Sequence, residues 1–335
     1  MSQRLQLAAL VLGLGLFASL IYGIGPWTIV ADLGQIGWGI AVIVGLELAV
    51  DAVNTMGWRL TFAPSDRTVS FPVLFLVRLA GTAVNQAVPA ATVGGEPVKV
   101  MLLRPYVAAA NAWASVITAK LSYGVAQSVF VLCGLLVAFR GLDVPTSISR
   151  ALFGALGLTL AGLAAFFGLQ RRGLFAATGA AAGRLGLPEY WTDWLRRATG
   201  SLDDQIRDVL VLRRGDFLRS VAWHLSAFAI GVLQVFLLLR WLGLPADLLT
   251  CVAIETFSLL VQLALFLVPA SIGVQEGGKV LIFTALGLPA AAGLAVGLAF
   301  RLTQIAEIAL GLGAFSALHW RQRQHRRDVV AGSGI

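Results

Sequence analysis

One short element occurs twice in this chain of 335 residues, and its two copies lie 180 residues apart. Each copy runs from a proline through glycines to a glutamate seven residues on, and then to a lysine three residues further. Its members are Pro89, Gly94, Gly95, Glu96 and Lys99 in the first copy and Pro269, Gly273, Glu276 and Lys279 in the second. A duplicated, charged element that is broken by proline and glycine within apolar sequence is typical of membrane carriers built from two repeats.

Long apolar segments surround both copies. Hydrophobic residues make up 58% of the chain and charged residues 13%, which is about half their usual share in soluble proteins. We therefore expect an all-α polytopic membrane protein, because most of these segments have the roughly 20 apolar residues that cross a bilayer. The expected membrane segments are 5–24, 38–58, 71–88, 107–139, 150–169, 217–239, 247–268, 272–288 and 290–320.

The distribution of arginine predicts the orientation of these segments under the positive-inside rule. Residues 25–37 contain no Lys or Arg and are expected outside, whereas the arginine-rich 171–216 loop and both termini are expected in the cytoplasm. Residues 71–104 must then start and end inside, and residues 247–288 must start and end outside. Each is expected to be a helical hairpin broken at Pro/Gly, so that the halves form an inverted-topology repeat. This orientation is compatible both with hairpins that re-enter the membrane and with hairpins that span it fully.

This reading divides the chain into five parts and places it in the cell (inner) membrane as a multi-pass protein. They are a first transmembrane helix with an external loop (1–37), repeat one (38–139), a connecting span with a basic amphipathic loop (140–216), repeat two (217–320) and a basic tail (321–335).

The net charge of +8 does not indicate nucleic-acid binding, because the arginines concentrate in the 171–216 loop and the tail. Both regions are expected to contact anionic lipid headgroups at the cytoplasmic face. The sequence shows no phosphate loop, no nucleophile elbow and no clustered His or Cys. We therefore expect no metal, no cofactor and no catalytic residue, and a transporter is favoured over an enzyme.

The repeated element has the properties of an anion site inside a membrane. Gly94 and Gly95 permit a break in the backbone, and non-helical backbone at membrane depth occurs where protein or a wet cavity surrounds it. Pro97 suits the first turn of a new helix that begins near Glu96. The free amides of such a helix end attract a phosphate, and Lys99 adds a cation one turn on. The alternative is that each Glu–Lys pair only fixes the tip of its hairpin.

Further intramembrane charges accompany both copies. Lys120 follows Lys99 by 21 residues, and Arg301 follows Lys279 by 22 residues, each in the span after its hairpin. They are candidate second cations for the same anionic group, or lone charges that snorkel or pair with Glu307. Arg78 and Asn85 lie on the first hairpin, Glu47, Asp51, Asn54 and Glu255 are candidate partners for these bases, and His224 is expected at the membrane interface.

The sequence around both copies resembles a known family. The residues that carry the likeness are Asn85, Pro89, Gly94-Gly95-Glu96 and Lys99, followed by Pro269, Gly273, Glu276-Gly277 and Phe300-Arg301-Leu302. They resemble the flippase-like family related to the transmembrane region of lysylphosphatidylglycerol synthases, over residues 5–320. In length the chain is similar to the hopanoid-biosynthesis-associated branch. Glu96 and Lys99 stand where Asp and Arg are more usual, and Gln275 stands where a base often precedes the glutamate.

The resemblance implies movement of a lipid between leaflets. We expect an anionic or isoprenoid-derived lipid whose headgroup is engaged by Lys99, Lys120, Lys279 and Arg301, while Glu96 and Glu276 order the hairpin tips. One alternative is a membrane-embedded enzyme or an accessory protein in lipid biosynthesis, such as that of hopanoids, working with other lipid-synthesis enzymes. A second alternative is an ion-coupled carrier of small solutes.

Overall fold

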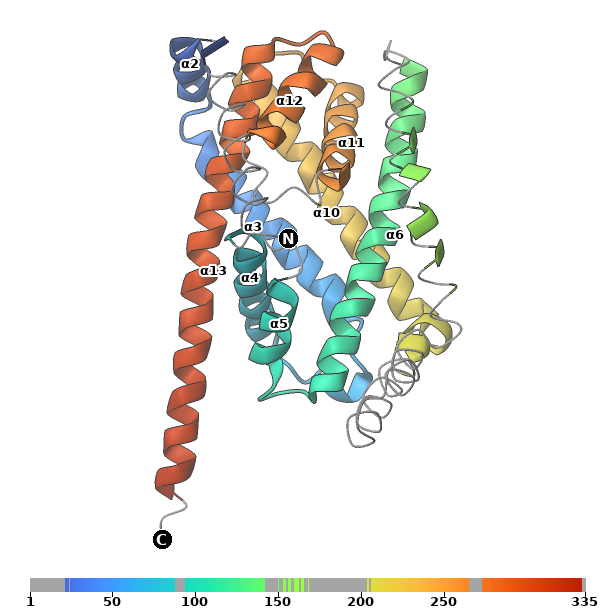
Figure 1. The fold of residues 1–335 in the computed structure, drawn as a ribbon, viewed down its shortest axis with the longest axis vertical. Coiled ribbons are helices and arrows are strands. Elements are labelled where there is room, and N and C mark those ends of the chain that lie inside the picture. Colours follow the sequence, from blue (N-terminus) through green and yellow to red (C-terminus); the bar gives the residue numbers. More distant parts are fainter. Residues whose placement is uncertain are drawn as a thin grey trace, which may run out of the picture.

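The protein is an all-α polytopic membrane protein (Figure 1). The computed structural model describes residues 22–23, 25–87, 94–141, 206–264 and 273–332, with isolated positions between 150 and 204. Its helices are α2 (Pro26–Ile36), α3 (Gly39–Arg59), α4 (Phe71–Ala87), α5 (Gly95–Leu103), α6 (Ala109–Gly141), α10 (Arg214–Trp241), α11 (Leu248–Ala264), α12 (Val274–Ala285) and α13 (Ala290–Gly332), with short turns η1 (Pro64–Asp66) and η2 (Asp208–Leu212). The span expected at 5–24 and the amphipathic part of the 171–216 loop lie largely outside these residues.

Four of the helices are long and apolar enough to cross a membrane. These segments are Gly39–Arg59, Ala109–Phe139, Arg214–Trp241 and Ala290–Arg321, in α3, α6, α10 and α13. In Figure 1, α3 and α13 run downwards along the chain, whereas α6 and α10 run upwards. The first spans of the two halves, α3 and α10, therefore run in opposite directions, and so do the last spans, α6 and α13. An inverted repeat requires this arrangement.

The hairpins lie at opposite ends of the molecule. In Figure 1, α4 and α5 occupy the lower half, and α11 and α12 occupy the upper half. The returning arms are short, with 9 residues in α5 and 12 residues in α12. At 1.5 Å per residue they measure about 14 and 18 Å, against a hydrocarbon thickness of about 30 Å. Both returning arms are therefore shorter than a full membrane crossing.

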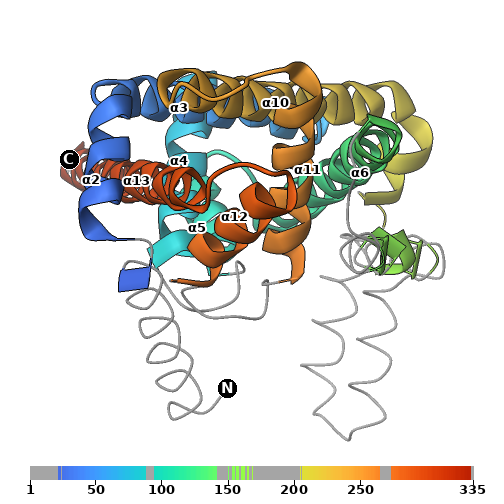
Figure 2. The ribbon, with the colours of Figure 1, turned by 90° about the horizontal axis from the view of Figure 1, so that it is seen from above.

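The two halves interlock through their hairpins. The first arm of each hairpin packs on the last span of the other half, α4 on α13 and α11 on α6. Small residues allow these close approaches: a Cβ at Gly311 would overlap the Leu79 carbonyl of α4, and a Cβ at Gly134 would overlap the Thr256 side chain of α11. Figure 2 shows α3 and α10 together along one side, with α5 and α12 towards the opposite side.

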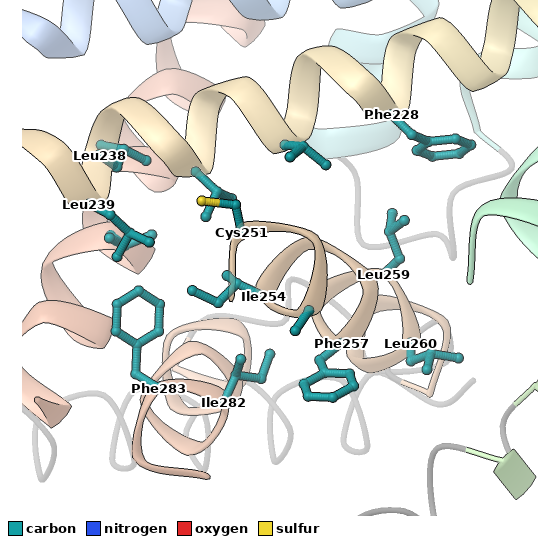
Figure 3. Close-up of a cluster of buried hydrophobic side chains, with 14 of the residues drawn as sticks. Phe228, Leu238, Leu239, Cys251, Ile254, Phe257, Leu259, Leu260, Ile282 and Phe283 are labelled. Carbon is teal, nitrogen blue, oxygen red and sulfur yellow. The ribbon is translucent and has the colours of Figure 1, made fainter. Parts of the chain in front are cut away.

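Apolar packing fixes each hairpin to its own half. In repeat two, Phe228 and Leu238 of α10 pack with Ile254 and Phe257 of α11 and with Phe283 of α12 (Figure 3). In repeat one, a separate cluster joins α3 to the first hairpin, and its members include Trp58, Leu74, Val77, Leu102 and Leu103. Each hairpin thus packs as a unit against the span that precedes it.

The turn before α11 shows why this helix begins where it does. The backbone amide of Thr250 donates to Oδ1 of Asp247 at 2.9 Å, which satisfies one of the free N–H groups of the helix end. The same amide holds the pKa of the Asp247 carboxyl below its ordinary value.

At the other end of repeat two, α13 continues to Gly332, so residues 321–332 of the basic tail extend the last membrane helix.

Candidate functional site

The first polar site forms where α5 begins. Gly94 caps the helix and Gly95 is its first residue, which confirms the predicted start near Glu96. The Gly95 amide donates to Oδ1 of Asn85 at 2.7 Å, and Nδ2 of Asn85 donates to Oε1 of Glu96 at 3.3 Å. A Cβ at Gly95 would overlap the carbonyl of Gly81, so the glycine allows the two hairpin arms to touch.

Two lysines bind the carboxylate of Glu96, which is 5% exposed. Nζ of Lys99 lies 3.2 Å from Oε2, and Nζ of Lys120 lies 3.0 Å from Oε1. Lys99 is buried, with its ammonium 5.8 Å from the centre of the Trp58 ring, whereas the Lys120 side chain is 52% exposed. We refer to Asn85, Glu96, Lys99 and Lys120 as the first carboxylate site.

The second polar site forms where α12 begins. Gly273 has a φ of 78°, a conformation that favours glycine, and its amide donates to Oε2 of Glu276 at 2.8 Å. Arg301 of α13 binds Oε1 of the same carboxylate through Nε and through a terminal nitrogen, both at 2.8 Å. The Arg301 guanidinium also donates to Gln304 at 3.0 Å. We refer to Gly273, Glu276 and Arg301 as the second carboxylate site.

Lys279 does not reproduce the role of Lys99, contrary to the expectation that both copies form the same Glu–Lys pair. Its ammonium donates to Oγ of Ser258 at 2.7 Å and lies 4.7 Å from the centre of the Phe300 ring. The Gly273 amide and Arg301 already occupy the two oxygens of Glu276, so the lysine extends to α11 instead. The charge of Glu255 acts on this lysine.

Arg78 and Asp51 form a third ion pair in the interior. Nε of Arg78 donates to Oδ1 of Asp51 at 2.7 Å, which joins α4 to α3. The charge of Arg78 also acts on Lys99, Glu47 and Glu307. Arg78 therefore links the first carboxylate site to acids on two other helices, and Asp51 is one of the partners that the sequence had suggested.

Glutamine side chains hold two further acids. Nε2 of Gln234 donates to Oε2 of Glu47 at 2.9 Å, and Nε2 of Gln86 donates to Oε2 of Glu307 at 2.9 Å. Glu307 thus has an amide partner on α4, and Lys120 and Arg301 instead bind the hairpin glutamates. The sequence reading missed both glutamines and Ser258, although each is a polar residue inside an apolar segment and so a candidate for such a role.

His224, which the sequence places at the membrane interface, is buried between helices. It is 1% exposed, its Nδ1 lies 2.6 Å from Oδ1 of Asn54, and its ring contacts Tyr123 edge-on. The polar partner on α3 satisfies Nδ1, whereas Nε2 is buried without a hydrogen-bond partner. Asn54 thereby acts as a structural partner for α10.

Most of the residues predicted for a substrate site gather into these clusters. Gly94, Gly95, Glu96, Lys99, Lys120 and Asn85 lie together, as do Gly273, Glu276 and Arg301, while Arg78 and Lys279 lie in contacts next to them. Pro89 and Pro269 lie outside the described residues.

The fold and these clusters define a polytopic helical membrane protein whose interior carries paired charges at the starts of two short returning arms. A family model described as the lysylphosphatidylglycerol synthase TM region matches residues 6–311, and the chain belongs to this family. A UPF0104 membrane protein from Methanothermobacter thermautotrophicus is 29% identical over 163 residues, which cover 48% of this chain and 41% of the relative. The match thus spans less than half of that relative. No solved structure matches the chain significantly.

Proposed function

We propose that the protein moves a lipid with an anionic headgroup between the leaflets of a membrane. The observation that carries this proposal is the first carboxylate site, where Lys99 and Lys120 converge from two helices on one carboxylate. Two cations that bind a carboxylate in this way can also bind a phosphate, because both are oxyanions that accept charge-assisted hydrogen bonds.

Glu96 acts in this proposal as an internal substitute for the headgroup. Without a substrate, two lysines inside the membrane need a counter-charge, since an unpaired cation at mid-bilayer costs about 3 kcal/mol on insertion scales. The carboxylate supplies it. An incoming phosphate would take over one or both lysines, and Glu96 would retain the Asn85 amide as a partner. The half-exposed Lys120 is the cation that a headgroup would meet first.

The second carboxylate site would bind the same headgroup in the other half of the protein. Arg301 binds Glu276 through two nitrogens, a fork geometry that also suits phosphate. The hairpins enter from opposite ends (Figure 1), so a headgroup could pass from one site to the other while its acyl chains stay in lipid. This reading connects the repeat to transport between two leaflets.

Leaflet exchange in liposomes tests the proposal. The purified protein is reconstituted with fluorescent phosphatidylglycerol or fluorescent phosphatidylcholine, and a membrane-impermeant reductant bleaches the outer leaflet. We expect faster exchange of the anionic lipid, and a loss of at least about tenfold in Lys120→Ala, which corresponds to about 1.4 kcal/mol. The control is Arg219→Ala, whose side chain is 75% exposed and pairs with Asp216 at the surface. Equal rates for wild type and Lys120→Ala would refute the headgroup role.

Mass spectrometry of the same lipids separates transport from chemistry. A translocase leaves every lipid mass unchanged. A new lipid mass that depends on the protein would instead support the membrane-embedded enzyme, with Glu96 or Glu276 as an acid–base group.

A further inference from the structure

Two buried acceptor atoms without a donor belong to side chains that bind Glu307 or act on it by charge. Oδ2 of Asp51 and Oε1 of Gln86 are buried and have no hydrogen-bond partner. Asp51 is only 4% exposed, and its other oxygen is taken by Arg78. Gln86 donates to Glu307, and the charge of Asp51 acts on Glu307. Buried acceptors of this kind are rare, because each loses its hydration without compensation.

The carboxylates in this region outnumber the cations. We term Glu47 and Glu307 the acid pair: the charges of Glu47 and Asp51 act on Glu307, that of Asp51 acts on Glu47, and each of the pair accepts a hydrogen bond from a neutral glutamine amide. Arg78 is the cation common to all three acids, and it is bound to Asp51. Like charges this close in a membrane interior repel strongly, and a proton on one of them relieves the repulsion.

Other titratable groups lie on the surrounding helices. They are Glu276 and Lys279 on α12, Glu255 on α11, His224 on α10, Tyr123 on α6 and Asp32 on α2. Glu276 is bound by Arg301, Lys279 by Ser258, and His224 by Asn54. Glu255 acts on Glu47 and on Lys279, so it connects the acid pair to the second hairpin.

We propose that the acid pair takes up and releases a proton, and that this proton is the ion coupled to lipid movement. The proton converts one carboxylate into an O–H donor, which is the group that the orphaned acceptors lack. The coupling follows from position: Gln86 lies on the first hairpin, and Glu307 lies on α13, the last span of the other half. Protonation therefore changes a contact between the two halves. The coupling to lipid movement rests on the proposed function. The proton site rests on the acid pair alone.

The variant that tests the proton is Glu307→Gln. Its amide oxygen still accepts from Gln86, and its NH₂ group supplies a permanent donor, so the protein should fold as a mimic of the protonated state. Glu47→Gln provides a second variant. The matched control is Asp32→Asn, a carboxyl group on α2 at the end of the molecule.

Infrared difference spectroscopy of the reconstituted protein measures the proton without any lipid assay. Wild type should lose the C=O band of a protonated carboxyl group as the pH rises, and this change should be absent in Glu307→Gln and present in Asp32→Asn. A wild-type spectrum without such a pH-dependent band, or one equal to that of Glu307→Gln, would overturn the proton site.

Leaflet exchange of fluorescent phosphatidylglycerol under an imposed pH gradient measures the coupling. Wild type and Asp32→Asn should accumulate the lipid in one leaflet by up to about tenfold per unit of pH difference, the limit of about 1.4 kcal/mol that one coupled proton supplies. Glu307→Gln should show no accumulation. Exchange that ignores the pH gradient, or that follows a sodium gradient instead, would overturn the coupling. A pH-dependent carboxyl band together with no leaflet exchange of any lipid would preserve the proton site and refute the translocase.

Discussion

Nζ of Lys120 lies 3.0 Å from Oε1 of Glu96, which joins the span α6 to the start of the short arm α5 by an ion pair. The second half has a counterpart in the contact between Arg301 and Glu276 at 2.8 Å. Each hairpin is therefore tied by charge to the span that follows it in the same half. It is tied by apolar packing to the last span of the other half. The charged contact is made by the returning arm, α5 or α12, and the packing contact by the first arm, α4 or α11.

The first prediction concerns Glu96→Gln. This change leaves Lys99 buried without its carboxylate, and removing one partner of a buried ion pair costs about 3 kcal/mol. Cys251 is fully buried and reports unfolding when it reacts with a fluorogenic maleimide, after the exposed Cys133 is replaced by Ser. We expect a lower thermal midpoint in this background, measured in detergent.

A matched double variant checks the cause. Glu96→Gln with Lys99→Met removes the buried cation together with the carboxylate and should recover part of the lost stability, since the Lys120 side chain is half exposed. A double variant that is as unstable as the sum of the two single variants would contradict the ion pair as the source.

The second prediction concerns Arg301→Lys. Lysine keeps the charge but cannot place two nitrogens on Oε1 of Glu276 as the guanidinium does. We expect a stability loss of about 1–2 kcal/mol, near the net value of a charged hydrogen bond. The same Cys251 assay measures it, and Arg219→Lys at an exposed position serves as the control. An unchanged thermal midpoint for Arg301→Lys would show that the positive charge alone provides the stability, without the two-nitrogen geometry.

The third prediction concerns Gly95→Ala. The added methyl group would overlap the Gly81 carbonyl, which belongs to rigid backbone, so α4 and α5 must separate. Overpacking of this kind costs about 1–3 kcal/mol. Gly45→Ala on α3 is the control, because nothing lies near a Cβ there and alanine favours a helix. We expect Gly95→Ala to lower the thermal midpoint and Gly45→Ala to leave it equal or higher.

The fourth prediction concerns the sides from which the hairpins enter. In a background with both native cysteines replaced by Ser, Tyr106→Cys follows α5, and Leu248→Cys begins α11; these side chains are 45% and 73% exposed. A membrane-impermeant maleimide should label them from opposite sides of oriented vesicles. Trp27→Cys on α2, 84% exposed, should be labelled from the same side as Leu248→Cys. Labelling of Tyr106→Cys and Leu248→Cys from one side would contradict the inverted repeat.

Local sequence signals predicted much of the fold. The expected span 38–58 corresponds to α3 (Gly39–Arg59), and the hairpin arm 71–88 corresponds to α4 (Phe71–Ala87). Apolar length and the Gly/Pro breaks determine such boundaries, because a helix needs internal hydrogen bonds in lipid and glycine ends it easily. The repeated spacing also identified Glu96 and Glu276 as the acids of the two sites.

The partners of these acids could not be derived in the same way. Lys99 and Lys279 have the same place in the two copies, yet one binds a carboxylate and the other binds Ser258. The difference arises from Arg301, which reaches Glu276 from a helix that is 25 residues away along the chain. Pairing across helices depends on their rotation and distance, and these properties are set by packing.

The sequence by itself determined that this chain is a helical membrane protein with a duplicated, charged break, because hydrophobic length and glycine positions are local properties. Only the tertiary structure decided that both returning arms are short, that Lys120 and Arg301 bind the hairpin glutamates, and that His224 is buried against Asn54. It also decided that Gln86 binds Glu307, although they lie in different halves of the chain. The physical reason is that a charge inside a membrane pairs with whichever group the packed helices bring within reach.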